Sequence, residues 1–210
     1  MSFLDSLIKN PTSLLDSIIA RWGFKYSQKL LELYFGKCVE DKNMANNFVA
    51  LFHATGSTAL CLSTLFLEEK NKNLYYFLIK FSTGFFLYDI EHCIKYIKSK
   101  KTYVYVYHHI ISLYMLYYGP NDSIKILGLG ELSNIPSYFS YYLLKNNHNK
   151  TVLKYVTKIQ LILYSIIRIP LFSYIYYKNL KSGENKLFNV LILPLYFMGI
   201  YWSKILKSQL

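Results

Sequence analysis

Charged residues are scarce in this chain of 210 residues, and acidic residues are the scarcest of them. Charged residues make up 17% of the sequence, whereas an average soluble domain has about a quarter. With only nine glycines and five prolines, the composition excludes a collagen-like chain and a low-complexity disordered one. Apolar residues reach 53%, and they include 22 tyrosines and 14 phenylalanines.

Cysteine is also rare, and its three positions do not suggest a disulfide framework. Cys38, Cys61 and Cys93 are odd in number, and two of them fall within apolar stretches. The formal net charge is +12, but the basic residues are dispersed between apolar stretches. This pattern favours loops that face anionic lipid head groups, and we expect no nucleic-acid partner.

Long apolar stretches are abundant. Six stretches are close to the ~20 residues that a helix needs to cross a ~30 Å hydrocarbon core. They cover about 47–68, 74–97, 103–118, 123–144, 152–177 and 186–206. A soluble helical bundle would need a polar face on each helix, and several of these stretches offer almost none. The sequence therefore predicts an all-α, multi-pass membrane protein with six transmembrane helices.

Residues 13–35 differ from the six stretches because apolar side chains recur at helical spacing and charged ones form the opposite face. Such a two-faced helix is typical of the membrane interface, although a seventh, weakly hydrophobic span is left open. We divide the chain into an N-terminal amphipathic segment, 1–40, and a transmembrane domain, 41–210. Most of the loop lysines fall on the side of the two termini, so the positive-inside rule predicts that both termini are cytosolic.

The polar residues inside the predicted spans are candidate functional residues, because ionisable groups are costly at membrane depth. Helical rise places His53, Asp89 and His108 at similar depth in the cytosolic half. Glu131 and Arg168 fall at similar depth in the luminal half and are predicted to form an ion pair. His92 follows Asp89 by three residues and is within reach of a hydrogen bond. Adjacent histidines rarely bind one ion from a helix, so we expect no metal site.

Five segments that contain these polar residues resemble, in order and spacing, the TLC domain of ceramide synthases and related membrane proteins. The resemblance covers roughly 40–206 and implies a six-helix barrel with a lipid-accommodating interior, in the endoplasmic reticulum or a related membrane. The segments that carry it are Asn46–His53, Gly84–His92, Tyr107–Ser112, Gly130–Pro136 and Ile167–Pro170.

One segment departs from the ceramide synthases. Their second motif, His-Asp-x-x-Asp, aligns with Gly130-Glu131-Leu-Ser-Asn134, so the chain is more similar to the TLC-domain proteins that are not ceramide synthases. Fatty-acid elongases, which also have paired histidines, are a weaker alternative. Their His-x-x-His-His motif would require histidine at position 105, which is Tyr105 here.

Two functions follow as hypotheses. In the first, the protein binds membrane lipids and fatty-acyl chains and acts in lipid metabolism, sensing or trafficking. In the alternative, it is an acyl-CoA-dependent lipid acyltransferase, with acyl-CoA as co-substrate and no metal. His108 would then be the base or the acyl-accepting nucleophile, beside His109, and Asp89 would orient an imidazole. The expected substrate-binding residues are His53, His92, Glu131, Asn134 and Arg168. The sequence leaves open whether the protein is a homo-oligomer.

Overall fold

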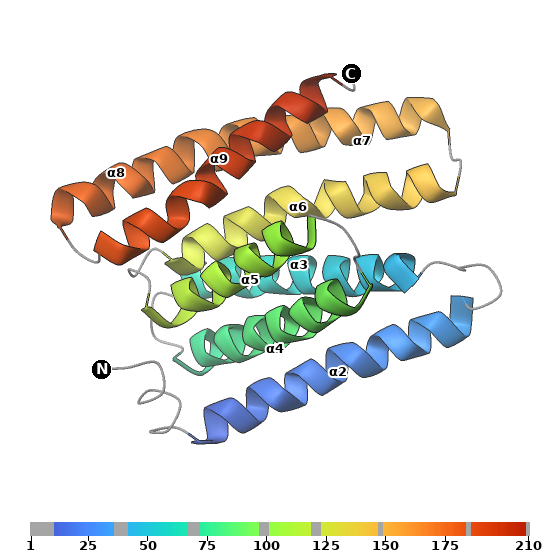
Figure 1. Cartoon of the computed structure of the whole chain (residues 1–210), viewed down its shortest axis with the longest axis horizontal. Helices are drawn as coiled ribbons and strands as arrows, with labels where there is room; N and C mark the ends of the chain where they lie inside the picture. Colours follow the sequence, from blue (N-terminus) through green and yellow to red (C-terminus); the bar gives the residue numbers. More distant parts are fainter. Residues whose placement is uncertain are drawn as a thin grey trace. The chain divides into compact units, whose positions relative to one another are not determined.

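The computed structural model describes residues 11–35, 42–66, 72–96, 101–118, 123–146, 149–183 and 186–208, and these ranges are helical almost throughout and contain no strand. The N-terminal helix predicted at 13–35 is confirmed as α2, Pro11–Phe35. Each of the six apolar stretches also forms a helix. They are α3 (Lys42–Phe66), α4 (Lys72–Tyr96), α5 (Lys101–Tyr118), α6 (Ser123–Lys145), the continuous α7 (Lys150–Leu163), η1 (Tyr164–Leu171) and α8 (Phe172–Ser182), and α9 (Lys186–Ser208) (Figure 1).

The chain forms two compact units that meet in sequence at Tyr117 and Tyr118. In the first unit, α2 packs along α4 and α3, and α3 packs against α4. In the second, α6 packs along α7, and α9 contacts α7, η1 and α8. Each unit is described below by itself.

Two helical segments of the described residues are both long and apolar enough to cross a bilayer by length and composition. One is the continuous α7–η1–α8 segment, Lys150–Ser182, and the other is α9. The other predicted spans carry the polar side chains discussed below, which lower their mean hydropathy.

The long segment of the second unit is widened where proline interrupts it. Pro170 lacks a backbone N–H and cannot continue α-helical hydrogen bonding, and residues Tyr164–Leu171 form a π-helix. Such π-helical turns are rare and often lie at functional sites. Asn149 caps the start of α7 through its side chain, and Gly183 ends α8 in the left-handed conformation, with φ of 69°.

Helices α2 and α4 lie side by side and run parallel (Figure 1). Asp16 pairs with Lys80, and Gln28 contacts His92. Between these contacts, Gly84 faces Ala20. All three contacts join residues 64 positions apart, and only parallel helices in register keep such a constant offset. The two helices therefore share their direction and almost their full length.

The buried face of α2 is partly polar, and its outer face is largely apolar. Ser17 and Gln28 are buried, whereas Leu15, Ile19 and Tyr26 are each more than half exposed. An apolar outer face suits lipid, and polar side chains at membrane depth turn toward neighbouring helices. Because α2 also has 25 residues, or about 37 Å of helix, this packing favours the spanning alternative for 13–35 over the interfacial one.

The parallel packing predicts a topology that differs from the sequence-based one. If α4 crosses the bilayer, α2 crosses beside it in the same direction, which adds a seventh crossing. The N-terminus and the C-terminus then lie on opposite faces of the membrane. Single cysteines introduced before Pro11 and after Ser208 should react with a membrane-impermeant thiol reagent from opposite sides of sealed vesicles. Labelling of both from one side would exclude a spanning α2.

The close approach at Gly84 predicts a strong effect of a single methyl group. A Cβ atom at this position would lie 2.5 Å from Ala20 Cβ and 2.8 Å from the Arg21 backbone nitrogen. Gly84→Ala should therefore separate α2 from α4 and destabilise the protein by about 1–3 kcal/mol, measured as a lower midpoint of thermal unfolding in detergent. Gly23→Ala is the matched control, because a Cβ at Gly23 meets nothing within 4 Å. Equal midpoints for the two variants would contradict this packing.

Candidate functional site

A buried carboxylate on α4 is the centre of the polar interior of the first unit. Asp89 accepts a hydrogen bond from Asn46 Nδ2 of α3 at 2.9 Å, and its other oxygen lies 2.7 Å from His109 Nε2 of α5. The thiol of Cys93, one helical turn after Asp89, donates to the same oxygen at 3.8 Å. We call Asn46, Asp89, Cys93 and His109 the Asp89 cluster. It joins three helices through one side chain.

The Asp89 cluster continues into α2 through neutral polar side chains. The Tyr88 hydroxyl lies 2.7 Å from Asn46 Oδ1 and 2.8 Å from Gln28 Oε1. The Gln28 amide donates to Glu32 at 2.9 Å and lies 3.4 Å from His92 Nδ1. Sequence analysis predicted no role for Gln28, Asn46 or Tyr88, because tyrosine and amide residues are common in this chain and have no distinctive spacing. Asn46 and Tyr88 lay in segments that carried the family resemblance, and Gln28 did not.

The predicted histidines occupy different surroundings. His109 is the imidazole that pairs with Asp89, and its other nitrogen, Nδ1, is buried without a hydrogen-bond partner. The neighbouring His108 is partly exposed, and its ring centroid lies 5.3 Å from that of His109. The structure thus brings the second histidine of the pair onto the carboxylate, whereas the sequence singled out the first.

His53, another predicted site residue, lies among aromatic rings. It is fully buried and stacks on Phe85, with ring centroids 3.9 Å apart and an interplanar angle of 7°. Neither ring nitrogen has a hydrogen-bond partner. His53 therefore packs as a flat ring between α3 and α4, next to the Asp89 cluster but without a hydrogen bond to it.

In the second unit, a buried arginine of the π-helix is held by one segment of α6. The Arg168 guanidinium donates to Ser133 Oγ at 2.9 Å, to the Gly130 carbonyl at 3.1 Å and to Asn134 Oδ1 at 2.6 Å. It also lies over the Tyr164 ring, 4.6 Å from the centroid. These residues and Glu131 form what we call the Arg168 cluster.

The predicted ion pair between Glu131 and Arg168 is replaced by a bridge. Asn134 accepts from Arg168 through Oδ1 and donates to Glu131 Oε2 through Nδ2 at 3.3 Å. Ion pairs are seen elsewhere in the described residues, at Arg21–Glu91, Lys25–Glu91, Lys80–Asp16 and His109–Asp89. Glu131 and Arg168 are neighbours on either side of one amide. Helical rise gives depth and not the direction of a side chain.

Three atoms of the Asp89 cluster could bind a metal ion. The ligand atoms of Asp89, Cys93 and His109 all lie within 4.8 Å of one another and are buried. Sulfur, nitrogen and oxygen together are a donor set that zinc accepts. Sequence analysis expected no metal and did not consider Cys93 as a ligand. This residue joins the group because it follows Asp89 by four residues on one helix face.

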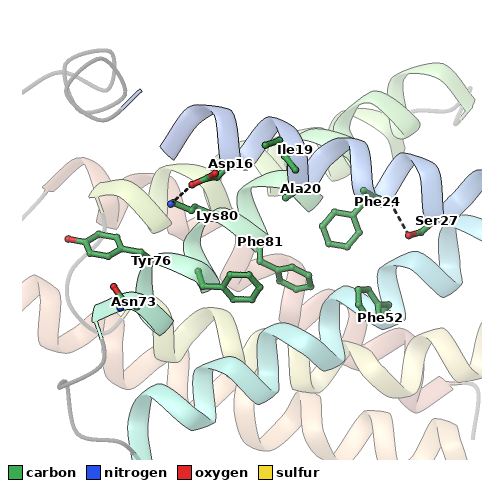
Figure 2. Close-up of a pocket in the computed structure, with 12 residues that line it drawn as sticks. Asp16, Ile19, Ala20, Phe24, Ser27, Phe52, Asn73, Tyr76, Lys80 and Phe81 are labelled. Carbon is green, nitrogen blue, oxygen red and sulfur yellow. Dashed lines mark hydrogen bonds and ion pairs between the residues drawn. The ribbon is translucent and has the colours of Figure 1, made fainter. Parts of the chain in front are cut away.

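A groove opens on the first unit between α2 and α4. Its volume is about 910 Å³, at the upper end of the range of about 300–1,000 Å³ for ligand pockets. The walls are mainly aromatic, from Phe24 of α2, Phe52 of α3 and Phe81 of α4, while Asp16 and Lys80 pair toward one end (Figure 2). Sequence analysis did not predict this groove, because one wall is α2.

Comparison with known proteins identifies the family. The model of the TLC domain matches residues 43–207. The chain belongs to the TLC-domain family. No curated protein and no solved structure matches the chain. The TLC domain is a membrane domain linked to lipid metabolism and sensing, and its match includes both the Asp89 and the Arg168 clusters but leaves out α2, which forms a wall of the groove.

The bridge in the Arg168 cluster predicts which pair of residues is coupled within this TLC domain. A hydrogen bond to a charged group contributes about 1.5–3 kcal/mol. A double-mutant cycle of Arg168→Met and Asn134→Leu should therefore give a coupling of this size in thermal or chemical unfolding. The same cycle with Glu131→Gln in place of the Asn134 change should give a smaller coupling. A larger coupling of Arg168 to Glu131 than to Asn134 would contradict the bridge and support a direct ion pair.

Proposed function

We propose that this protein binds a membrane lipid in the groove between α2, α3 and α4 and acts in lipid metabolism, sensing or trafficking. The observation that carries the proposal is the groove itself, about 910 Å³ and walled by phenylalanine rings. Membership of the TLC-domain family supports it. The endoplasmic reticulum or a related membrane is the location that we propose on the resemblance.

The groove suits an acyl chain because of what surrounds it. The exposed side chains of α2 are largely apolar, so the groove opens toward the hydrocarbon of the bilayer and a lipid can enter it from the side. Burial of apolar surface contributes about 25 cal/mol per Å², but bulk lipid is as apolar as the groove. Binding there depends on close packing against the rings, as association between membrane helices does.

Gly23 provides a direct test because it lines the groove and has open space around it. In the series Gly23→Ala, Gly23→Leu and Gly23→Phe, side chains of growing size should fill the groove without disturbing the helix. We expect binding of a fluorescent fatty-acyl probe by the purified full chain to fall by roughly tenfold or more at leucine and phenylalanine. The midpoint of unfolding should stay the same or rise, because glycine is about 1 kcal/mol less favourable than alanine in a helix.

The size series also has an outcome that would contradict lipid binding in the groove. If probe affinity is the same in all three variants and in the unmodified chain, the acyl chain binds elsewhere. Tyr26→Leu is the control for the outer face of α2, since Tyr26 is exposed and does not line the groove. This control should leave probe binding unchanged.

One observation favours acyl transfer as a second candidate. The Asp89–His109 pair leaves His109 Nδ1 without a partner, which is the arrangement of a general base oriented by a carboxylate. Nδ1 would take the proton of a lipid amine or hydroxyl as its nitrogen or oxygen attacks the thioester of acyl-CoA. The carbon–sulfur bond would then break, and the thiol of coenzyme A would leave with that proton.

Variants of the two histidines distinguish a base at His109, which the structure favours, from the base at His108 that the sequence suggested. With labelled acyl-CoA and a panel of amine and hydroxyl lipids, His109→Ala should abolish transfer, by roughly 100-fold or more. His108→Ala should retain most of it. The opposite order would return the role of base to His108. Absence of transfer in the unmodified protein with every lipid would leave lipid binding alone.

A further inference from the structure

The groove has a charged end. Asp16 of α2 and Lys80 of α4 form an ion pair there, and their side chains remain 44% and 29% exposed. Asn73 and Tyr76, from the first turns of α4, line the same pocket, and Figure 2 shows them on the side of Lys80 away from Phe24 and Phe52. The charged pair and most polar groups thus gather at one end, and the phenylalanine rings, with Ser27 at the far end, line the rest.

If α2 spans the bilayer as its packing favours, the charged end of the groove lies toward the membrane surface, and the groove has the length of one leaflet. Asp16 follows the start of α2 by five residues, or about 8 Å. From Asp16 to Ser27, the last residue of α2 in the lining, the helix rises about 16 Å. This is about half of a ~30 Å hydrocarbon core. An acyl chain that begins beside Asp16 and Lys80 would therefore end near the bilayer midplane.

An exposed ion pair at this depth requires a polar neighbour. Charged groups in contact with hydrocarbon are costly unless other polar groups solvate them. A lipid without charge, such as diacylglycerol, offers little to either side chain. A lipid with a net negative head group would meet Lys80 but be repelled by Asp16. Because the pair is neutral as a whole, its complement is a head group that carries both charges.

We propose that the groove binds a zwitterionic phospholipid, with the phosphate at Lys80, the ammonium group at Asp16 and one acyl chain along Phe81 and Phe24. The inference rests on the proposed lipid-binding function and adds the class of lipid. Tyr76 lies at the same end of the groove and supplies an aromatic ring, which attracts quaternary ammonium groups. Asn73 supplies amide hydrogens for the phosphate oxygens.

The experiment compares head groups at constant acyl chains. Purified full-length protein would be titrated with phosphatidylcholine, phosphatidylglycerol and diacylglycerol in competition with the fluorescent acyl probe. The unmodified chain should prefer phosphatidylcholine to the other two by about fivefold, as expected for one additional charge contact. Asp16→Asn leaves Lys80 alone and should shift the preference to phosphatidylglycerol. Lys80→Gln should lower affinity for both phospholipids.

The charge-swapped variant, Asp16→Lys with Lys80→Asp, keeps the ion pair and serves as the matched control. It should retain the preference for phosphatidylcholine, and it remains informative if a single variant fails to fold. Equal affinity of the unmodified chain for the three lipids, with no shift in Asp16→Asn, would overturn head-group recognition but leave acyl binding intact. A failure of the Gly23 series would instead overturn the groove as the lipid site.

Discussion

The close parallel contact between α2 and α4 is the constraint on which the first unit depends. Gly84 lets the two backbones approach so closely that even a methyl group would collide with Ala20. On one side of this contact, Arg21 and Lys25 of α2 pair with Glu91 of α4. Aromatic side chains of α2, α3 and α4 line the groove beside this contact. One small residue thus allows the close contact that accompanies both the ion pairs and the proposed lipid site.

The same contact links α2 to the polar interior. Gln28 connects α2 to Tyr88, and Tyr88 contacts Asn46. Asn46 in turn donates a hydrogen bond to Asp89 Oδ1. Because Asn46 uses its amide hydrogens for Asp89 and its oxygen for Tyr88, the carboxylate has little freedom to rotate. The second Asp89 oxygen is left for His109 and Cys93. The groove and the Asp89 cluster are therefore two parts of one helix arrangement.

Sequence analysis predicted the helices and the polar positions well because both depend on local patterns. The length of the apolar stretches and the charged segments between them predicted the helices. The candidate site residues were predicted because an aspartate or histidine within an apolar stretch is rare. Contacts were less predictable. Adjacent histidines point about 100° apart, and nothing in the sequence says which of them faces Asp89. Asn134 intervened between Glu131 and Arg168 because a short amide can reach both. The outward orientation of the apolar face of α2 depends on its surroundings, and so the groove could not be predicted.

The parallel register of α2 and α4 is the central claim, and cross-linking tests it most directly. In a cysteine-free full-length chain in native membranes, cysteine pairs would be placed at 16 and 80, at 28 and 92, and crosswise at 16 and 92 and at 28 and 80. A short bifunctional thiol reagent should join the first two pairs and leave both crosswise pairs unlinked. Efficient linking of the crosswise pairs, with no reaction at 16 and 80 or at 28 and 92, would show antiparallel helices and contradict the groove, the topology and the lipid site together.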